Sequence, residues 1–152
     1  MTEKIKAAVA ARRDPDFMII ARTDARAVED FNRTVDRAQR YIEAGADAIF
    51  PEALQTPDEF RNFASRIDCP LLANMTEFGK SPLHSFEDLV GFGYRMVIFP
   101  QSAFRVSMKA SEEFLRALKQ SGTQKEWLGE MQTREELYKL LDYDPTAEKW
   151  RG

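Results

Sequence analysis

Four short apolar runs divide the chain at fairly regular intervals. They are Phe17–Ala21, Ala46–Phe50, Pro70–Ala73 and Arg95–Phe99. Each run is nearly continuous in its apolar residues and does not alternate with polar ones, a pattern typical of strands that are buried on both faces. We therefore predict that these runs are strands of a parallel sheet.

Helical patterns fill the intervals between the runs. An apolar stripe runs from Phe31 to Ile42 at the spacing of one helix face, and Gly45 follows where a C-terminal cap is expected. Helix starts are predicted where a serine or threonine precedes acidic residues, at Thr56, Ser85 and Thr133. The longest predicted helix carries a stripe made by Phe104, Met108, Ser111, Leu115 and Leu118.

Strands that alternate with helices indicate βα units joined by right-handed crossovers. A complete (β/α)₈ barrel of the TIM type needs about 250 residues and eight such units, whereas this chain has 152 residues and four predicted strands. A small doubly wound sheet is the rival architecture, but it favours a glycine-rich turn after the first strand, where this chain has Arg22–Asp24. We predict an α/β half-barrel over residues 1–122.

Residues 123–152 are predicted to form a C-terminal helical extension. This stretch is rich in charged residues but carries several apolar ones that need burial, either against the barrel or against another subunit: Trp127, Leu128, Met131, Leu137, Leu140 and Leu141.

Composition narrows the classes of function. Lysine and arginine total 22 against 25 acidic residues, and this near balance gives no reason to expect a nucleic acid or an anionic membrane as a partner. No apolar run approaches the ~20 residues that span a bilayer, and the N-terminus lacks the apolar core of a secretory signal. A single cysteine excludes an internal disulfide. We expect a cytoplasmic globular protein.

Polar residues follow the predicted strands, where a βα barrel places its chemistry. Arg22 follows the first run, Glu52 the second, and Asn74 and Thr76 the third. Arg22 offers a planar fork for a carboxylate or phosphate, or an ion pair with Asp24 or Glu52. Glu52 fits a base, a metal-shell ligand or a partner of Arg22, while Asn74 and Thr76 fit ligand donors or caps of the strand end. Their convergence indicates a binding site.

Two other residues are weaker candidates for chemistry. Cys69 precedes the third strand and so lies at the N-terminal end of the barrel, where residues serve stability. His84 is the only histidine, which excludes a metal site built from histidines, and we do not expect it to be catalytic.

An ordered set of motifs gives the chain a family resemblance. Residues 16–25, which include Ala21-Arg22-Thr23-Asp24, resemble the fifth barrel strand of the isocitrate lyase and phosphoenolpyruvate mutase superfamily. Further segments resemble the methylisocitrate lyase family within it, and this places the chain at the C-terminal half of the barrel. These segments are Ala44–Ala53, Leu72–Gly79, Phe99–Arg105, Gly122–Lys125 and Met131–Arg134.

The resemblance implies a Mg²⁺-dependent carbon–carbon lyase that splits 2-methylisocitrate into pyruvate and succinate, in propionate breakdown through the methylcitrate cycle. It implies substrate-binding roles for Arg22, Glu52, the segment Asn74-Met75-Thr76, Arg105 and Arg134, with Glu52 also in the outer shell of the metal. A tricarboxylate substrate needs arginines and neutral donors, and fixed positive charge would stabilise the aci-carboxylate formed on cleavage.

The chain departs from the family pattern in one important respect. The family's catalytic cysteine lies in a Lys-Arg-Cys-Gly-His loop that this sequence does not contain, and the paired aspartates that bind the metal belong to earlier strands. No catalytic residue is therefore assigned, and we expect little or no activity from the chain alone. Alternatives are isocitrate lyase, oxaloacetate decarboxylase, a phosphonopyruvate or carboxyphosphonate enzyme, or a non-catalytic half-barrel that assembles as a homo-oligomer or with a complementing N-terminal half.

Overall fold

The computed structural model describes residues 1–146, and the last part of the predicted extension, residues 147–152, lies outside the described residues. The chain divides into two compact units, Met1–Arg105 and Val106–Gly152. The predicted boundary at residue 122 stays a prediction.

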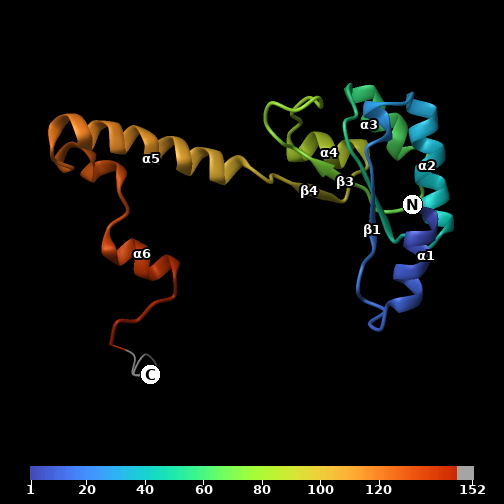
Figure 1. Cartoon of the computed structure of the whole chain (residues 1–152), viewed down its shortest axis with the longest axis horizontal. Coiled ribbons are helices and arrows are strands. Elements are labelled where there is room, and N and C mark those ends of the chain that lie inside the picture. The colour runs from blue at the N-terminus through green and yellow to red at the C-terminus, as the bar shows by residue number, and fades with distance from the viewer. Residues whose placement is uncertain (147–152) are drawn as a thin grey trace. The chain divides into compact units, whose positions relative to one another are not determined.

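A small parallel sheet forms the centre of the first unit (Figure 1). Strands β1 (Ile20–Thr23) and β2 (Ala48–Pro51) pair in parallel, as do β3 (Leu72–Asn74) and β4 (Met96–Ile98). A parallel bridge between Ile49 and Leu71 joins the two pairs, so the spatial order follows the chain order. The α/β class with parallel strands is confirmed.

Helices α1 (Thr2–Ala11), α2 (Phe31–Glu43), α3 (Pro57–Ala64) and α4 (Phe86–Phe92) accompany these strands, and the short 3₁₀ helix η1 (Ala25–Ala27) follows β1. The predicted stripe of α2 is confirmed, because Val35 and Ala38 are buried and Phe31 and Ile42 pack against the core. The core also contains Ile5, Ile49, Leu54, Phe60, Phe63, Leu71 and Leu89.

The predicted helix ends are also confirmed. The side chain of Thr56 accepts the Glu59 N–H at the start of α3, and Ser85 makes a reciprocal capping box with Asp88 at the start of α4. Gly45 adopts a left-handed conformation (φ 100°) just after α2. These caps satisfy backbone donors and carbonyls that a helix end leaves unpaired.

The predicted burial of every strand on both faces is wrong for β1 and β4. Strand β1 starts at Ile20, three residues later than predicted, and its burial alternates so that only Ala21 and Thr23 are buried. In β4, Ile98 is exposed. Strand β2, by contrast, is largely buried on both faces.

The second unit consists of helices with little core. It contains most of α5 (Ser102–Ser121), the 3₁₀ helix η2 (Lys125–Glu130) and α6 (Arg134–Leu140). A capping box at Thr133 starts α6, as predicted, and the rings of Phe114 and Trp127 meet edge to face at 5.7 Å. Of the six residues predicted to need burial, only Trp127 is half-buried, and the others are exposed in this chain: Leu128, Met131, Leu137, Leu140 and Leu141.

Across residues 1–146, we find no helix that is both long enough and apolar enough to cross a lipid bilayer.

A candidate anion-binding site at the strand ends

The carboxyl ends of β1, β2 and β3 bring the predicted polar residues to one edge of the sheet. Arg22 is the third residue of β1, and the Glu52 N–H that follows β2 donates to the Thr23 carbonyl at 2.9 Å. Asn74 ends β3, and the amide next to it, on Met75, donates to the Ile98 carbonyl at 2.9 Å. Parallel register therefore collects side chains from positions 22, 52 and 74.

Arg22 is held by two carboxylates. Its Nε and Nη2 donate to the two carboxylate oxygens of Asp24 at 3.0 and 2.8 Å, and Nη2 also lies 3.2 Å from Oε2 of Glu52. The guanidinium carbon lies 4.8 Å from the centroid of the Phe50 ring. The ion pair that the sequence left open thus forms in the ligand-free chain.

This pairing keeps both partners charged and leaves part of the arginine available. The hydrogen bond to Asp24 raises the pKa of Arg22, and the same hydrogen bond lowers the pKa of Asp24. The Arg22 side chain is 48% exposed, and within residues 1–146 its Nη1 has no acceptor. Nη1 is therefore free to donate to an anion.

Asn74 extends the network to the third strand. Its Nδ2 donates to Oε2 of Glu52 at 3.2 Å, while its Oδ1 is buried and has no hydrogen-bond partner. A buried carbonyl oxygen without a donor is costly, and such a group needs a partner from water or a ligand. The site therefore offers a free donor at Arg22 and a free acceptor at Asn74, a combination suited to a hydroxy acid.

Met75 and Thr76 occupy the loop after β3. The Met75 side chain is buried, and its sulfur accepts the His84 N–H at 3.2 Å, so this side chain serves packing. Thr76 is half-buried, and a Cβ added at Gly79 would come within 3.1 Å of its methyl group. Substrate binding by residues 75 and 76 stays a prediction.

Arg105 belongs to a second acid–arginine pair at the same edge. Its Nε lies 3.5 Å from Oε2 of Glu77, and the Ser102 hydroxyl donates to Oε1 of Glu77. The Arg105 guanidinium carbon lies 5.3 Å from the centroid of the exposed Phe78 ring. Sequence reasoning did not single out Glu77, although an acidic residue three positions beyond Asn74 was a usable signal.

The remaining sequence candidates lie elsewhere. Arg134 is the first residue of α6 in the second unit, and its role in substrate binding stays a prediction. Cys69 precedes β3 and its side chain contacts the Pro70 carbonyl, with a pKa raised by burial. His84 packs edge to face between Phe60 and Phe92, at 4.9 and 5.1 Å. These positions agree with structural roles for Cys69 and His84.

The strand ends do not by themselves form a metal centre. Within residues 1–146, no three histidine, cysteine, aspartate or glutamate side chains cluster so as to hold a metal ion. Oε2 of Glu52 already accepts a hydrogen bond from Asn74 and forms an ion pair with Arg22. The described residues therefore do not fit a primary Mg²⁺ site, because Mg²⁺ requires several oxygen ligands in octahedral geometry.

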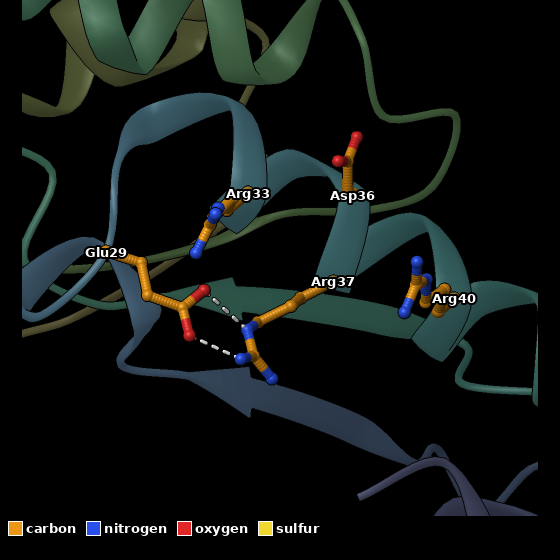
Figure 2. Close-up of a pocket in the computed structure, with 5 residues that line it drawn as sticks. All are labelled: Glu29, Arg33, Asp36, Arg37 and Arg40. Carbon is orange, nitrogen blue, oxygen red and sulfur yellow. Dashed lines mark hydrogen bonds and ion pairs between the residues drawn. The ribbon is translucent and has the colours of Figure 1, made fainter.

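A second charged depression is formed by residues of α2 and by Glu29, which precedes that helix (Figure 2). It has a volume of about 290 Å³ and is lined by Glu29, Arg33, Asp36, Arg37 and Arg40. Glu29 and Arg37 form a bidentate ion pair there. Sequence reasoning missed this cluster, although arginines at helical spacing on the polar face of α2 were visible. Because acidic side chains in the lining offset part of the positive charge of the arginines, we expect this depression to bind an anion only weakly.

Comparisons with known proteins give consistent relatives. A family model described as phosphoenolpyruvate phosphomutase matches residues 1–119. A 2-methylisocitrate lyase of Aeropyrum pernix is 56% identical over 143 residues, which cover 94% of this chain and 46% of that protein. One of Bacillus subtilis is 51% identical, over 94% of this chain and 47% of the relative. The chain thus spans about half the length of these curated relatives.

Solved structures agree at the level of fold. A crystal structure of 2,3-dimethylmalate lyase, described as a member of the PEP mutase/isocitrate lyase superfamily, has a TM-score of 0.82 and 32% identity, over 93% of this chain and 51% of that one. Phosphonopyruvate hydrolase in complex with oxalate and Mg²⁺ has a TM-score of 0.80 and 32% identity, over 93% and 50%.

Proposed function

Because the chain belongs to the phosphoenolpyruvate phosphomutase family, we propose that its strand ends bind the carboxylates of a small oxo-acid or hydroxy-acid substrate. The observation that carries this proposal is the network of Arg22, Glu52 and Asn74 at adjacent strand ends, with a free arginine nitrogen and an orphaned amide oxygen. Arginine binds carboxylates with two parallel hydrogen bonds and is the usual choice for this task.

The proposed substrate is 2-methylisocitrate, and the proposed reaction is its cleavage to pyruvate and succinate, a step of propionate catabolism in the cytoplasm. Relatives that carry the name 2-methylisocitrate lyase are 46–56% identical over most of this chain, whereas the solved dimethylmalate lyase and phosphonopyruvate hydrolase are 32% identical. This difference favours the tricarboxylate over the substrates of those two enzymes.

The chemistry explains why arginines are needed. The substrate hydroxyl loses its proton, its oxygen becomes the carbonyl of pyruvate, and the electrons of the broken carbon–carbon bond pass to the succinate half. That half is stabilised as an aci-carboxylate before a proton is added. Positive charge fixed near this group lowers the barrier. We assign this role to Arg22 and Arg105, with Asn74, Met75, Thr76 and Arg134 as further substrate contacts.

We also propose that the chain is the C-terminal half of a TIM-type barrel and that Mg²⁺ is the cofactor. Support comes from the parallel order of β1 to β4 and from the Mg²⁺ in the phosphonopyruvate hydrolase complex. Glu52 would lie in the outer shell of the ion. Since the described residues do not form a primary site, no step above is assigned to the metal.

A nuclear magnetic resonance titration tests where a carboxylate binds. Succinate is added to the 152-residue chain with Mg²⁺ present throughout, and the side-chain resonances of Arg22 and Asn74 are expected to shift together with the Thr76 amide. Arg33 and Arg40, which line the depression on α2 (Figure 2), serve as internal controls and should not shift. Shifts confined to these two arginines, or no shifts at all, would contradict the proposal.

A further inference from the structure

The loop after β3 and the start of α5 meet through one carboxylate. Glu77 accepts a hydrogen bond from the Ser102 hydroxyl through Oε1, and its Oε2 faces Nε of Arg105 at 3.5 Å. Glu77 thus connects the loop after β3 to two residues that follow β4. Both partners come from the first turn of α5, where the Arg105 N–H donates to the Gln101 carbonyl at 2.8 Å.

Glu77 is fixed and charged in this position. Its side chain is only 24% exposed, and the hydrogen bond from Ser102 is the largest cause of a lowered pKa. Oε2 is buried and has no hydrogen-bond partner, so its closest described cation, Nε of Arg105, interacts with it by charge. A carboxylate held in this way presents a constant negative charge to the arginine at neutral pH.

Arg105 is held at one edge only. Besides the contact of Nε with Glu77, its guanidinium carbon lies over the Phe78 ring at 5.3 Å, and within residues 1–146 its two terminal nitrogens have no acceptor. Phe78 itself has a positive φ of 61°, which is costly for a bulky residue and occurs where the surroundings impose it. The loop is therefore built so that residues 77 and 78 both contact Arg105.

The arrangement resembles that of Arg22, which is held along its Nε edge by Asp24. In both cases an acidic residue from a strand end contacts Nε and leaves terminal nitrogen for another acceptor. A guanidinium held by its Nε edge keeps its rotamer, so less side-chain entropy is lost when a ligand binds.

From this geometry we propose that Glu77 is a positioning residue, which holds Arg105 so that its terminal nitrogens bind a substrate carboxylate. This role rests on the proposed function, because it requires that the strand ends bind a carboxylate. Glu77 does not contact the reacting atoms in this account and acts only through Arg105.

The first measurement needs no ligand. The Nε–H resonance of Arg105 in the full chain should report an ordered side chain, and in Glu77→Gln, which keeps the shape but loses the charge, it should become mobile. Glu87→Gln, an exposed glutamate of α4, is the matched control and should leave it unchanged. An Arg105 resonance with the same mobility in the wild type and Glu77→Gln would overturn the proposal.

The second measurement is a double-mutant cycle for succinate affinity, with Mg²⁺ present, over the wild type, Glu77→Gln, Arg105→Ala and the double variant. Glu77→Gln should weaken binding about tenfold when Arg105 is present, and hardly at all in Arg105→Ala. An equal loss in both backgrounds, no loss, or tighter binding by Glu77→Gln would overturn the role of Glu77 alone. A wild-type chain that binds no succinate would overturn both this role and the proposed function.

Discussion

Arg22 shares one terminal nitrogen between two carboxylates, Asp24 at 2.8 Å and Glu52 at 3.2 Å. These three side chains carry a net charge of about −1 together, because an ionised pair with a second acid leaves one negative charge unmatched. A carboxylate ligand therefore needs further positive charge, and Arg105 is the candidate at this edge of the sheet. The ion pairs with Asp24 and Glu52 hold the Arg22 side chain in place, but they leave this edge of the sheet without a net positive charge.

The half-buried His84 gives a test of stability against pH. His84 packs between Phe60 and Phe92, its Nε2 is buried without a partner, and its pKa is lowered, mainly by burial. The folded chain therefore disfavours the protonated imidazole. As the pH falls below the ordinary pKa of 6.5, this histidine takes up a proton more readily in the unfolded chain than in the folded chain. The free energy of unfolding therefore decreases as the pH falls.

We expect the free energy of unfolding of the wild type to decrease from about pH 7.5 to about pH 5.5 more than that of His84→Phe, which cannot be protonated. Urea unfolding at the two pH values measures both. The comparison is between slopes, so a uniform effect of the larger ring does not matter. Equal decreases in the two proteins would show that His84 does not resist protonation in the fold.

At the scale of elements, helix ends were predictable from sequence and strand burial was not. Caps such as Ser85 and Thr133 act on backbone groups a few residues away, so local sequence specifies them. The burial of Ile20 and Ile98 depends on what covers the far face of the sheet, which an apolar run cannot reveal. For the same reason, the sequence predicted that Arg22 lies at a strand end, but it left open which partner the guanidinium takes. The structure shows the hydrogen bond to Asp24.

The capping box at the start of α4 should contribute measurably to the stability of the chain. Ser85 accepts the Asp88 N–H at 3.1 Å, and the Asp88 carboxylate accepts the Ser85 N–H at 3.0 Å. Ser85→Ala should lower the free energy of unfolding by about 1 kcal/mol, since the helix start loses an acceptor for a backbone donor. Chemical denaturation measures the change.

Ser65→Ala provides the control for this substitution. Ser65 is exposed at the C-terminal end of α3, and its hydroxyl donates to the Asn62 carbonyl. A surface change of this kind should stay within about 0.5 kcal/mol. If the two alanine variants lost equal stability, the capping box would not be the source of the effect.

At the scale of the whole molecule, the chain exposes apolar residues on strands that a closed barrel would cover. Ile20 of β1 is 39% exposed and Ile98 of β4 is 36% exposed. Uncovered apolar sheet faces and free strand edges favour association. Whether the chain associates with itself or with a complementing half stays a proposal, and its predicted extension over residues 123–152 is a further candidate for subunit contact.

We expect light scattering after size-exclusion chromatography to give a mass above the 17.5 kDa of one chain. Ile98→Lys should shift the mass toward the monomer, because it places a charge on the exposed face of β4. Val28→Lys is the control, since Val28 is 84% exposed after η1 and lies outside the strands. A monomeric wild type, or the same change with both lysine variants, would count against association through this face.

The measurement that tests the account most directly is the affinity of the chain for 2-methylisocitrate by calorimetry, with Mg²⁺ present, in the wild type, Arg22→Ala and Arg33→Ala. Loss of one charge-assisted pair, worth about 1.5–3 kcal/mol, predicts binding about 10- to 150-fold weaker for Arg22→Ala. Arg33→Ala, on the exposed face of α2, should bind as the wild type does. Absence of binding by the wild type, or equal affinity with and without Arg22, would contradict a carboxylate site at these strand ends.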